Sequence, residues 1–266
     1  MTRNTSICFC GALVAASALI TPAVGQEVQG KEPRRIRVAA GAQVAPVFPG
    51  ARTVSAQPFG NIWLARGGEL FEFKAPDDSY GISIVQGGGL SIGPAFGYVG
   101  SRTAKDVGLN LPKVGATIEV GGFAQYSVSD SLRLRGEVRK GLGGHRGVVS
   151  NFGADFVSRD GDAWLFSVGP RLTIADRTYQ NAYVGVAPTS SVATGLPAYS
   201  ARGGIQSVGL TAGYLRELSS HWGLSTFAKY DRLVGSAADS PIVMRYGSRN
   251  QFSGGLAATF TFRANR

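Results

Sequence analysis

One stretch of the chain gathers residue types that could carry out hydrolytic chemistry. Residues 221–243, HWGLSTFAKYDRLVGSAADSPIV, hold a histidine, aspartates and serines within 23 positions. In many hydrolases a histidine takes the proton of a serine hydroxyl while an aspartate orients the imidazole ring. The three side chains must then lie within about 3 Å of one another. Whether residues of this stretch can meet in that way depends on the elements that carry them.

Apolar and polar residues alternate with period two along several long segments of the chain. The clearest examples are 114–128, 132–139, 164–174 and 250–263. This period indicates long antiparallel strands with one apolar and one polar face. No segment shows a convincing helical period, so the predicted fold class is all-β.

Two all-β architectures fit this alternation. A soluble barrel or sandwich turns the apolar face inward and has strands of about 5–6 residues. A transmembrane barrel turns the apolar face to lipid and uses strands of about 9–11 residues. The long segments, the aromatic residues near their ends and the aromatic-rich last segment favour the second architecture. We therefore predict a transmembrane antiparallel up-and-down β-barrel of about 12 strands, within a range of about 10–14.

The alternation also assigns side chains to the two faces of the predicted barrel. Facing lipid we expect Trp164, Phe166, Leu172, Leu134 and Leu210. Facing the lumen we expect Arg133, Arg135, Arg171 and Lys229. The ladder of Arg133, Arg135 and Arg139 fits two roles: it could line a path for anions, or acidic neighbours could neutralise it across a filled lumen.

The expected strands set the sidedness of the loops. They are 36–46, 53–66, 69–75, 80–98, 114–128, 130–141, 146–158, 161–174, 177–186, 201–216, 220–234 and 250–263. An even number places both termini in the periplasm, so 187–200 and 235–249 become long extracellular loops. The same count makes the polar segment 99–113 periplasmic, where long loops are unusual. Either the count is off by one near that segment, or the segment folds into the periplasm or the lumen.

The start of the chain has the three-part layout of a secretory signal peptide. Arg3 precedes an apolar run from Ile7 to Ile20, and small residues follow up to Gly25. The apolar run is shorter than the roughly 18 residues that a transmembrane helix needs. We therefore expect residues 1–25 to be a signal peptide, 26–35 a periplasmic N-terminal arm and 36–266 a single outer-membrane β-barrel.

The composition of the mature chain narrows the choice of partners. Both cysteines, Cys8 and Cys10, lie in the predicted signal peptide, so the mature chain has no disulfide and no cysteine metal site. Removing Arg3 from the 27 lysines and arginines leaves 26 against 17 acidic residues, a net charge of +9. Because the chain is exported, we expect outer-membrane lipid or an acidic polysaccharide as the electrostatic partner, and no nucleic acid.

In this architecture the stretch 221–243 is one strand followed by a loop. Ten residues of about 3.3 Å each separate His221 from Asp231 by roughly 33 Å. Ser240 lies beyond Asp231, and His145 falls in a predicted periplasmic turn. We therefore expect no catalytic residue and no bound cofactor.

Two acidic pairs could hold a calcium ion but are predicted as turns. Asp77 and Asp78 are adjacent, and Asp160 and Asp162 flank Gly161. Aspartate beside glycine is standard turn chemistry, because the carboxylate bonds to nearby backbone N–H groups. We expect no metal site in the chain.

Four segments carry a resemblance to a known family. They are YDRLVGSAADSPIV (230–243), GGHRG (143–147), YQNAYVGV (179–186) and GLPAYSARGG (195–204). In order and spacing they resemble the MipA/OmpV family, named after the MltA-interacting protein. The resemblance implies an outer-membrane barrel, and some members are described as scaffolds that link a lytic transglycosylase to a peptidoglycan synthase.

The expected function is therefore a non-catalytic outer-membrane scaffold with a periplasmic murein hydrolase or synthase as partner. A small channel is the alternative, and a lipid-modifying barrel enzyme is a more remote one; the oligomeric state stays open. The expected strand order places the N-terminal arm and the turn 141–146 on the periplasmic side. Arg34, Arg35, His145 and Arg146 are thus the candidate periplasmic partner rim, although the same charges would also suit lipid head groups.

Overall fold

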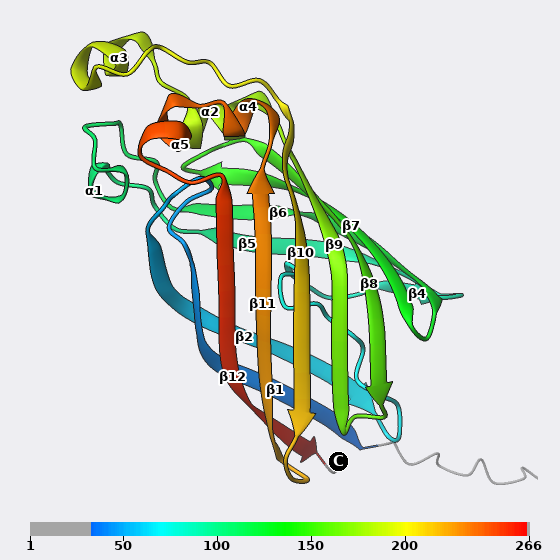
Figure 1. The fold of residues 1–266 in the computed structure, drawn as a ribbon. Coiled ribbons are helices and arrows are strands. Elements are labelled where there is room, and N and C mark those ends of the chain that lie inside the picture. Colours follow the sequence, from blue (N-terminus) through cyan, green and yellow to red (C-terminus); the bar gives the residue numbers. More distant parts are fainter. Residues whose placement is uncertain (1–32, 265–266) are drawn as a thin grey trace, which may run out of the picture. The chain divides into compact units, whose positions relative to one another are not determined.

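The computed structural model describes residues 33–264, which form an all-antiparallel β-barrel of twelve strands (Figure 1). The predicted signal peptide 1–25 and residues 26–32 of the predicted arm lie outside the described residues. The strands are β1 (Arg34–Pro46), β2 (Val54–Arg66), β3 (Tyr80–Gly81), β4 (Val85–Gly87), β5 (Leu90–Val99), β6 (Thr117–Ser129), β7 (Leu132–Gly143), β8 (Val148–Asp160), β9 (Trp164–Ala175), β10 (Gly204–Glu217), β11 (Trp222–Leu233) and β12 (Asn250–Ala264).

The strands follow one another around the barrel in nearly sequential order. The order is β2-β1-β12-β11-β10-β9-β8-β7-β6-β5-β3, with β4 also paired to β5. The pairing of β1 with β12, from Arg34 opposite Ala264 onward, joins the first and the last of the described strands. Among the described strands, β2 has no pairing with β3, β4 or β5, so the barrel is nearly closed. We call the boundary between β2 and the β3–β5 strands the seam.

The predicted alternation is confirmed, with the apolar face outward. On β7, Leu134 and Val138 are exposed, whereas Arg133 and Glu137, the residues directly before them, are buried. The other side chains predicted to face lipid lie on the same outer face: Phe166 and Leu210 are exposed, and Trp164 and Leu172 are partly exposed. Such a surface suits contact with lipid rather than with water.

The two ends of the barrel differ in their connections. At one end, which we call the cap end, the loops contain α1 (Ala104–Val107), α2 (Arg177–Val184), α3 (Pro188–Thr194), α4 (Gly235–Ala238) and α5 (Pro241–Arg245) (Figure 1). At the opposite end, the turn end, short turns join β6 to β7, β8 to β9 and β10 to β11. No helix within residues 33–264 combines the length and apolar character needed to cross a membrane.

Apolar packing holds the cap-end loops together. We call the buried cluster formed there the cap core; it includes Phe48, Tyr183, Leu196, Ile242 and Val243. Local capping fixes the helices that supply it. The Asp176 carboxylate accepts a hydrogen bond from the Tyr179 N–H at 2.7 Å, and the Ser240 hydroxyl accepts one from the Ile242 N–H at 3.2 Å.

The predicted number of strands is right, but two predicted strands are wrong. Residues 177–186 contain α2, because Asp176 caps a helix whose buried face carries Tyr179, Gln180, Tyr183 and Val184. Residues 69–75 form no strand and run inside the barrel instead. The predicted strand 80–98 is divided into β3, β4 and β5, which restores the total of twelve.

The loss of one strand at 177–186 settles where the polar segment 99–113 lies. It connects β5 to β6 at the cap end and contains α1. The counting error that the first explanation placed near this segment lies at 69–75 and 177–186 instead. Between these two false strands, every connection lies at the end of the barrel opposite to the predicted one.

Candidate functional site

Residues 67–79, between β2 and β3, run through the barrel lumen. We call them the inner segment. Phe71 and Ala75 of this segment are buried, at 2% and 0% exposed. Its polar side chains contact inward-facing residues of five strands, β6, β7, β9, β10 and β11, so it occupies space that an open pore would leave to water.

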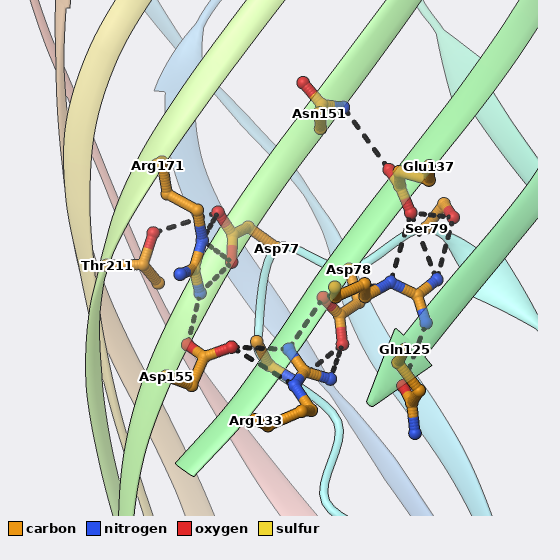
Figure 2. A network of polar contacts seen from close by, with 12 residues as sticks. Asp77, Asp78, Ser79, Gln125, Arg133, Glu137, Asn151, Asp155, Arg171 and Thr211 are labelled. Atoms are coloured by element: carbon orange, nitrogen blue, oxygen red, sulfur yellow. Dashed lines mark hydrogen bonds and ion pairs between the residues drawn. The ribbon is translucent and has the colours of Figure 1, made fainter. Parts of the chain in front are cut away.

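Asp77 of the inner segment contacts three neighbouring strands. Its carboxylate lies 2.9 Å from Nε of Arg171 on β9 and 3.1 Å from Nζ of Lys229 on β11. The Thr211 hydroxyl on β10 donates to it at 2.9 Å (Figure 2). Two cations and a hydroxyl thus neutralise and orient one carboxylate.

Asp78 makes the corresponding contacts on the other side of the lumen. It accepts a hydrogen bond from Nη1 of Arg133 at 2.6 Å and lies 3.5 Å from Nε of Arg135. It also accepts from the Ala75 N–H at 2.8 Å, which closes the turn predicted at Asp77–Asp78. The prediction of a turn is confirmed, but the carboxylates serve the lumen as well as the turn.

Asp155 on β8 connects these two halves. Its two oxygens accept from Nη2 of Arg133 at 2.6 Å and from Nη2 of Arg171 at 2.7 Å (Figure 2). The residue is 1% exposed. Removing one partner from such a buried ionic cluster leaves an uncompensated charge, at a cost of about 3–5 kcal/mol.

Further toward the cap end the same pattern continues. Glu137 accepts from Arg135 at 3.0 Å, from Ser79 of the inner segment at 2.6 Å, and from Arg139. Glu119 accepts from Nε of Arg139 at 2.8 Å. We call these inward-facing acids, bases and their inner-segment partners the lumen network.

The arginine ladder is therefore neutralised by acidic neighbours, the second of its two predicted roles. All four cations predicted to face the lumen, Arg133, Arg135, Arg171 and Lys229, belong to the network. Two cavities that flank the inner segment inside the lumen measure only about 40 Å³ each. A larger cavity of about 470 Å³ lies toward the turn end, where Phe71, Phe73 and Arg133 belong to its lining. The inner segment and its paired charges therefore fill the middle of the lumen but not its turn-end part.

At the turn end, Phe71 anchors the inner segment between charged residues. The guanidinium carbons of Arg35 and Arg37 lie 4.8 and 4.2 Å from its ring centroid, a favourable cation–π geometry. Asp162 accepts from the Phe71 N–H at 3.1 Å and pairs with Arg35 at 2.9 Å. Asp160–Asp162 forms the predicted turn, and Asp162 points inward.

His145 lies buried at the cap end, where the sequence did not place it. Its Nε2 is 3.0 Å from Glu119, and its Nδ1 accepts from the Gly147 N–H at 3.0 Å. Gly141 makes room for the ring, because a Cβ there would lie 2.3 Å from the imidazole. The pairing with Glu119 is an acid–base contact that the sequence analysis missed, but both ring nitrogens are already bonded within the protein.

The candidate partner rim does not exist as predicted. Arg34 and Arg35, the last two residues of the predicted arm, are the first two residues of β1 and lie at the turn end. His145 and Arg146 join β7 to β8 at the cap end, and only Arg146 of these two is exposed. The prediction was wrong because it counted 69–75 and 177–186 as strands, which reversed the turn 141–146.

The residues of the apparent triad are separated, as expected. His221 lies in the exposed turn between β10 and β11, and its ring stacks on Phe260. Asp231 on β11 pairs with Lys229 at 3.2 Å. Ser240 is buried at the cap end, where its hydroxyl donates to the Val184 carbonyl at 2.6 Å.

Several solved structures resemble the chain at low sequence identity. An outer membrane channel from Pseudomonas putida F1 is 11% identical, with 92% of this chain and 100% of that chain covered and a TM-score of 0.33. A FadL homologue from Pseudomonas aeruginosa is 10% identical over 88% of this chain and 90% of that one, with a TM-score of 0.33. The outer membrane protein OprG from Pseudomonas aeruginosa is 10% identical over 88% and 98%, with a TM-score of 0.26. Scores this low carry no argument about function.

The comparison of the sequence with protein-family models assigns the chain to a family. No curated protein matches the chain. The family model of the MltA-interacting protein MipA matches residues 38–262, which run from β1 to β12 and include the inner segment and the cap. Together with the outward apolar face, the match makes the protein a β-barrel of the outer membrane. The chain belongs to the family of the MltA-interacting protein MipA.

Proposed function

We propose that the protein is a non-catalytic scaffold that holds a periplasmic murein hydrolase or synthase at the outer membrane. The family name supports this role, since it describes an interaction with MltA, a murein enzyme. The observation that carries the proposal is the filled middle of the lumen. A barrel whose interior is occupied by the inner segment and its paired charges is built as a rigid support rather than as an open channel.

The arrangement of the polar side chains supports a non-catalytic role. The nucleophile, base and acid of the apparent triad lie at different ends of the barrel. The pair formed by His145 and Glu119 has no free ring nitrogen, and Tyr179 packs edge-on against His145 with ring centroids 4.7 Å apart. A general base must reach a substrate proton within hydrogen-bond distance, and this imidazole reaches none.

The turn end is the surface we propose for docking the partner. Outer-membrane barrels keep their termini and short turns in the periplasm, and here β1 begins and β12 ends at the turn end. Arg34 and Arg66 lie opposite each other in the β1–β2 register, and both are exposed. Arg216 on β10 is also exposed at this end. These charges suit an acidic surface on a wall enzyme or an anionic wall polymer.

A pull-down with variants of the two ends tests this proposal. Arg34→Ser combined with Arg66→Ser should reduce capture of a purified murein hydrolase, and raising the salt concentration should weaken capture by the unmodified barrel. Arg202→Ser combined with Arg245→Ser removes two exposed charges from the cap end and serves as the matched control. Both variants must insert into membranes normally. If the turn-end variant captured the hydrolase as well as the unmodified barrel does, Arg34 and Arg66 would not be part of the docking site.

A further inference from the structure

A cavity at the seam is larger than the two cavities that flank the inner segment. It has a volume of about 470 Å³, which is within the range of about 300–1,000 Å³ that is usual for small-molecule sites. Leu64 of β2 lines it on one side, and Gln86, Gly87 and Leu90 of β4 and β5 line it on the other. Phe71 and Phe73 of the inner segment are also part of its lining.

Side chains, not another strand, occupy the free edge of β2. The Lys74 ammonium donates to the Ile62 carbonyl at 2.9 Å, and the Tyr80 hydroxyl donates to the Gly60 carbonyl at 3.3 Å. Pro58 lacks a backbone N–H, which is typical of an edge strand. Because these carbonyls already have donors, a partner strand would have to displace them, so the seam fits a ligand that contacts side chains.

The apolar part of the cavity is continuous with the outer surface. Leu64, Leu70 and Leu90 line it and are also 63%, 52% and 38% exposed. Ile84 and Val85 beside the seam are exposed as well. In a membrane this surface meets the acyl chains of lipid, so an alkyl chain can enter the cavity sideways without crossing water.

The charged part of the lining is negative once its ion pairs are taken into account. Arg133 and Arg159 line the cavity, but they pair with Asp78 and Asp155, and with Asp162. The remaining charged lining residues are all acids: Glu69, Glu72 and Asp130. Glu69 and Asp130 are exposed, and no ion pair involves either of them within residues 33–264. A cationic head group complements this mouth.

We propose that the seam cavity binds one amphiphile with an ammonium head group and a linear alkyl or acyl chain. The ammonium group lies at the turn end between Glu69 and Asp130. The chain lies along Leu64 and Leu90, with its inner part against Phe71 and Phe73. A single-chain amine and a phospholipid with an ammonium head group share this chemistry. The site is independent of the proposed scaffold function.

Photo-crosslinking to the full chain in micelles of the non-ionic detergent dodecyl maltoside tests the proposal. The probes are a dodecylamine and a dodecanoic acid that carry the same photoreactive group near the chain end. The amine should label the peptides that contain Leu64–Phe73 and Gln86–Ser91 about tenfold more than the acid does, because two exposed carboxylates each contribute modestly. Competition by phosphatidylethanolamine added to the micelles identifies a phospholipid as the occupant, whereas no competition identifies a single-chain amine.

Three variants separate the seam site from general adsorption to the barrel. Glu69→Gln combined with Asp130→Asn should abolish the preference for the amine, while Asp160→Asn, an exposed acid at the same end outside the cavity, should keep it. Leu90→Trp fills the cavity and should remove labelling by both probes. Equal labelling by amine and acid in the unmodified protein would overturn the proposal, as would labelling that persists in folded Leu90→Trp or that spreads over the outer apolar surface.

Discussion

The lumen network and the cap core fill the two interior spaces of the barrel with opposite kinds of contact. In the lumen, Asp155 is 1% exposed and bonds to two arginines on different strands. In the cap core, Tyr183 and Ile242 are equally buried but lie among apolar side chains. Apolar packing is non-directional and tolerates swaps of similar volume. Ion pairs require particular partners, so the lumen network fixes the position of the inner segment.

The largest effect should come from removing one charge of the lumen network. Asp155→Ala leaves parts of Arg133 and Arg171 without a partner, so the free energy of unfolding should fall by about 3–5 kcal/mol. Urea unfolding of the barrel in lipid vesicles measures the change. Asp239→Ala is the control, because its pair with Arg249 at 3.5 Å is exposed and should be worth less than about 0.5 kcal/mol. Equal effects of the two variants would contradict the role given to the network.

A large apolar deletion in the cap core should have a smaller and more local effect. Ile242→Ala removes a fully buried side chain, at a cost of about 2–5 kcal/mol where the cavity remains. We expect the cost to appear as faster protease cleavage within 177–245, with the barrel still folded. Loss of the barrel at the same protease concentration would show that cap and wall unfold together.

A single methyl group at Gly141 should test the contact between the cap and the wall. In Gly141→Ala the Cβ would lie 2.3 Å from the His145 ring, so the ring must move away from Glu119, at about 1–3 kcal/mol. Gly122→Ala is the matched control on β6, where the nearest atom to the Cβ is 3.5 Å away. Thermal unfolding of both variants measures the difference, and a control as unstable as Gly141→Ala would refute the steric explanation.

The smallest effect should be a loss of cap stability at high pH. Burial raises the pKa of the Tyr179 and Tyr183 phenols above the ordinary value of about 10. The neutral phenols therefore stabilise the folded cap fully below pH ~10, and this contribution is lost as the pH rises toward the folded pKa values. Protease sensitivity of the cap against pH measures the loss.

Replacing one of these phenols sharpens the test. The Tyr183 hydroxyl is buried without a hydrogen-bond partner, so Tyr183→Phe should fold well and lose less stability above pH ~10. Tyr98→Phe removes an exposed hydroxyl, 72% exposed as a residue, and should leave the pH profile unchanged. Identical profiles for Tyr183→Phe and the unmodified protein would contradict the argument.

The sequence predicts the wall of the barrel well and its interior poorly. Alternation along β7 and β9 reports directly which side chains meet lipid and which meet the lumen. The same period misleads at Glu69–Ala75, where Phe71 and Phe73 alternate with polar residues although no strand forms. Alternation of apolar and polar residues shows that side chains face two different environments, but it does not show that the backbone pairs with a neighbouring strand. The excess of lumen-facing cations was the available signal, since Asp77 and Asp78 are the acids needed to balance them.

The cap end was harder to predict because its elements are short. Residues 177–184 contain aromatic and β-branched residues that suit a strand. The helix they form has only eight residues, which is too short for its period to stand out in the sequence. Together with the false strand at 69–75, that error moved His145 to the wrong end of the barrel. The capping aspartate, Asp176, was the sequence signal for a helix start, and it outweighs the strand propensity that follows it.

The central claim is that the inner segment, held by paired charges, closes the lumen. Single-channel recording in planar bilayers tests it directly. The unmodified barrel should give no conductance steps. Asp77→Asn combined with Asp78→Asn releases the inner segment from Arg133, Arg171 and Lys229, which keep only their partners on the wall, Asp155 and Asp231. The lumen then holds two fewer negative charges, so anion-selective steps should appear, whereas Asp239→Asn should remain silent. A steady open-pore conductance of the unmodified barrel would contradict the account, because it would show a continuous aqueous path past the lumen network.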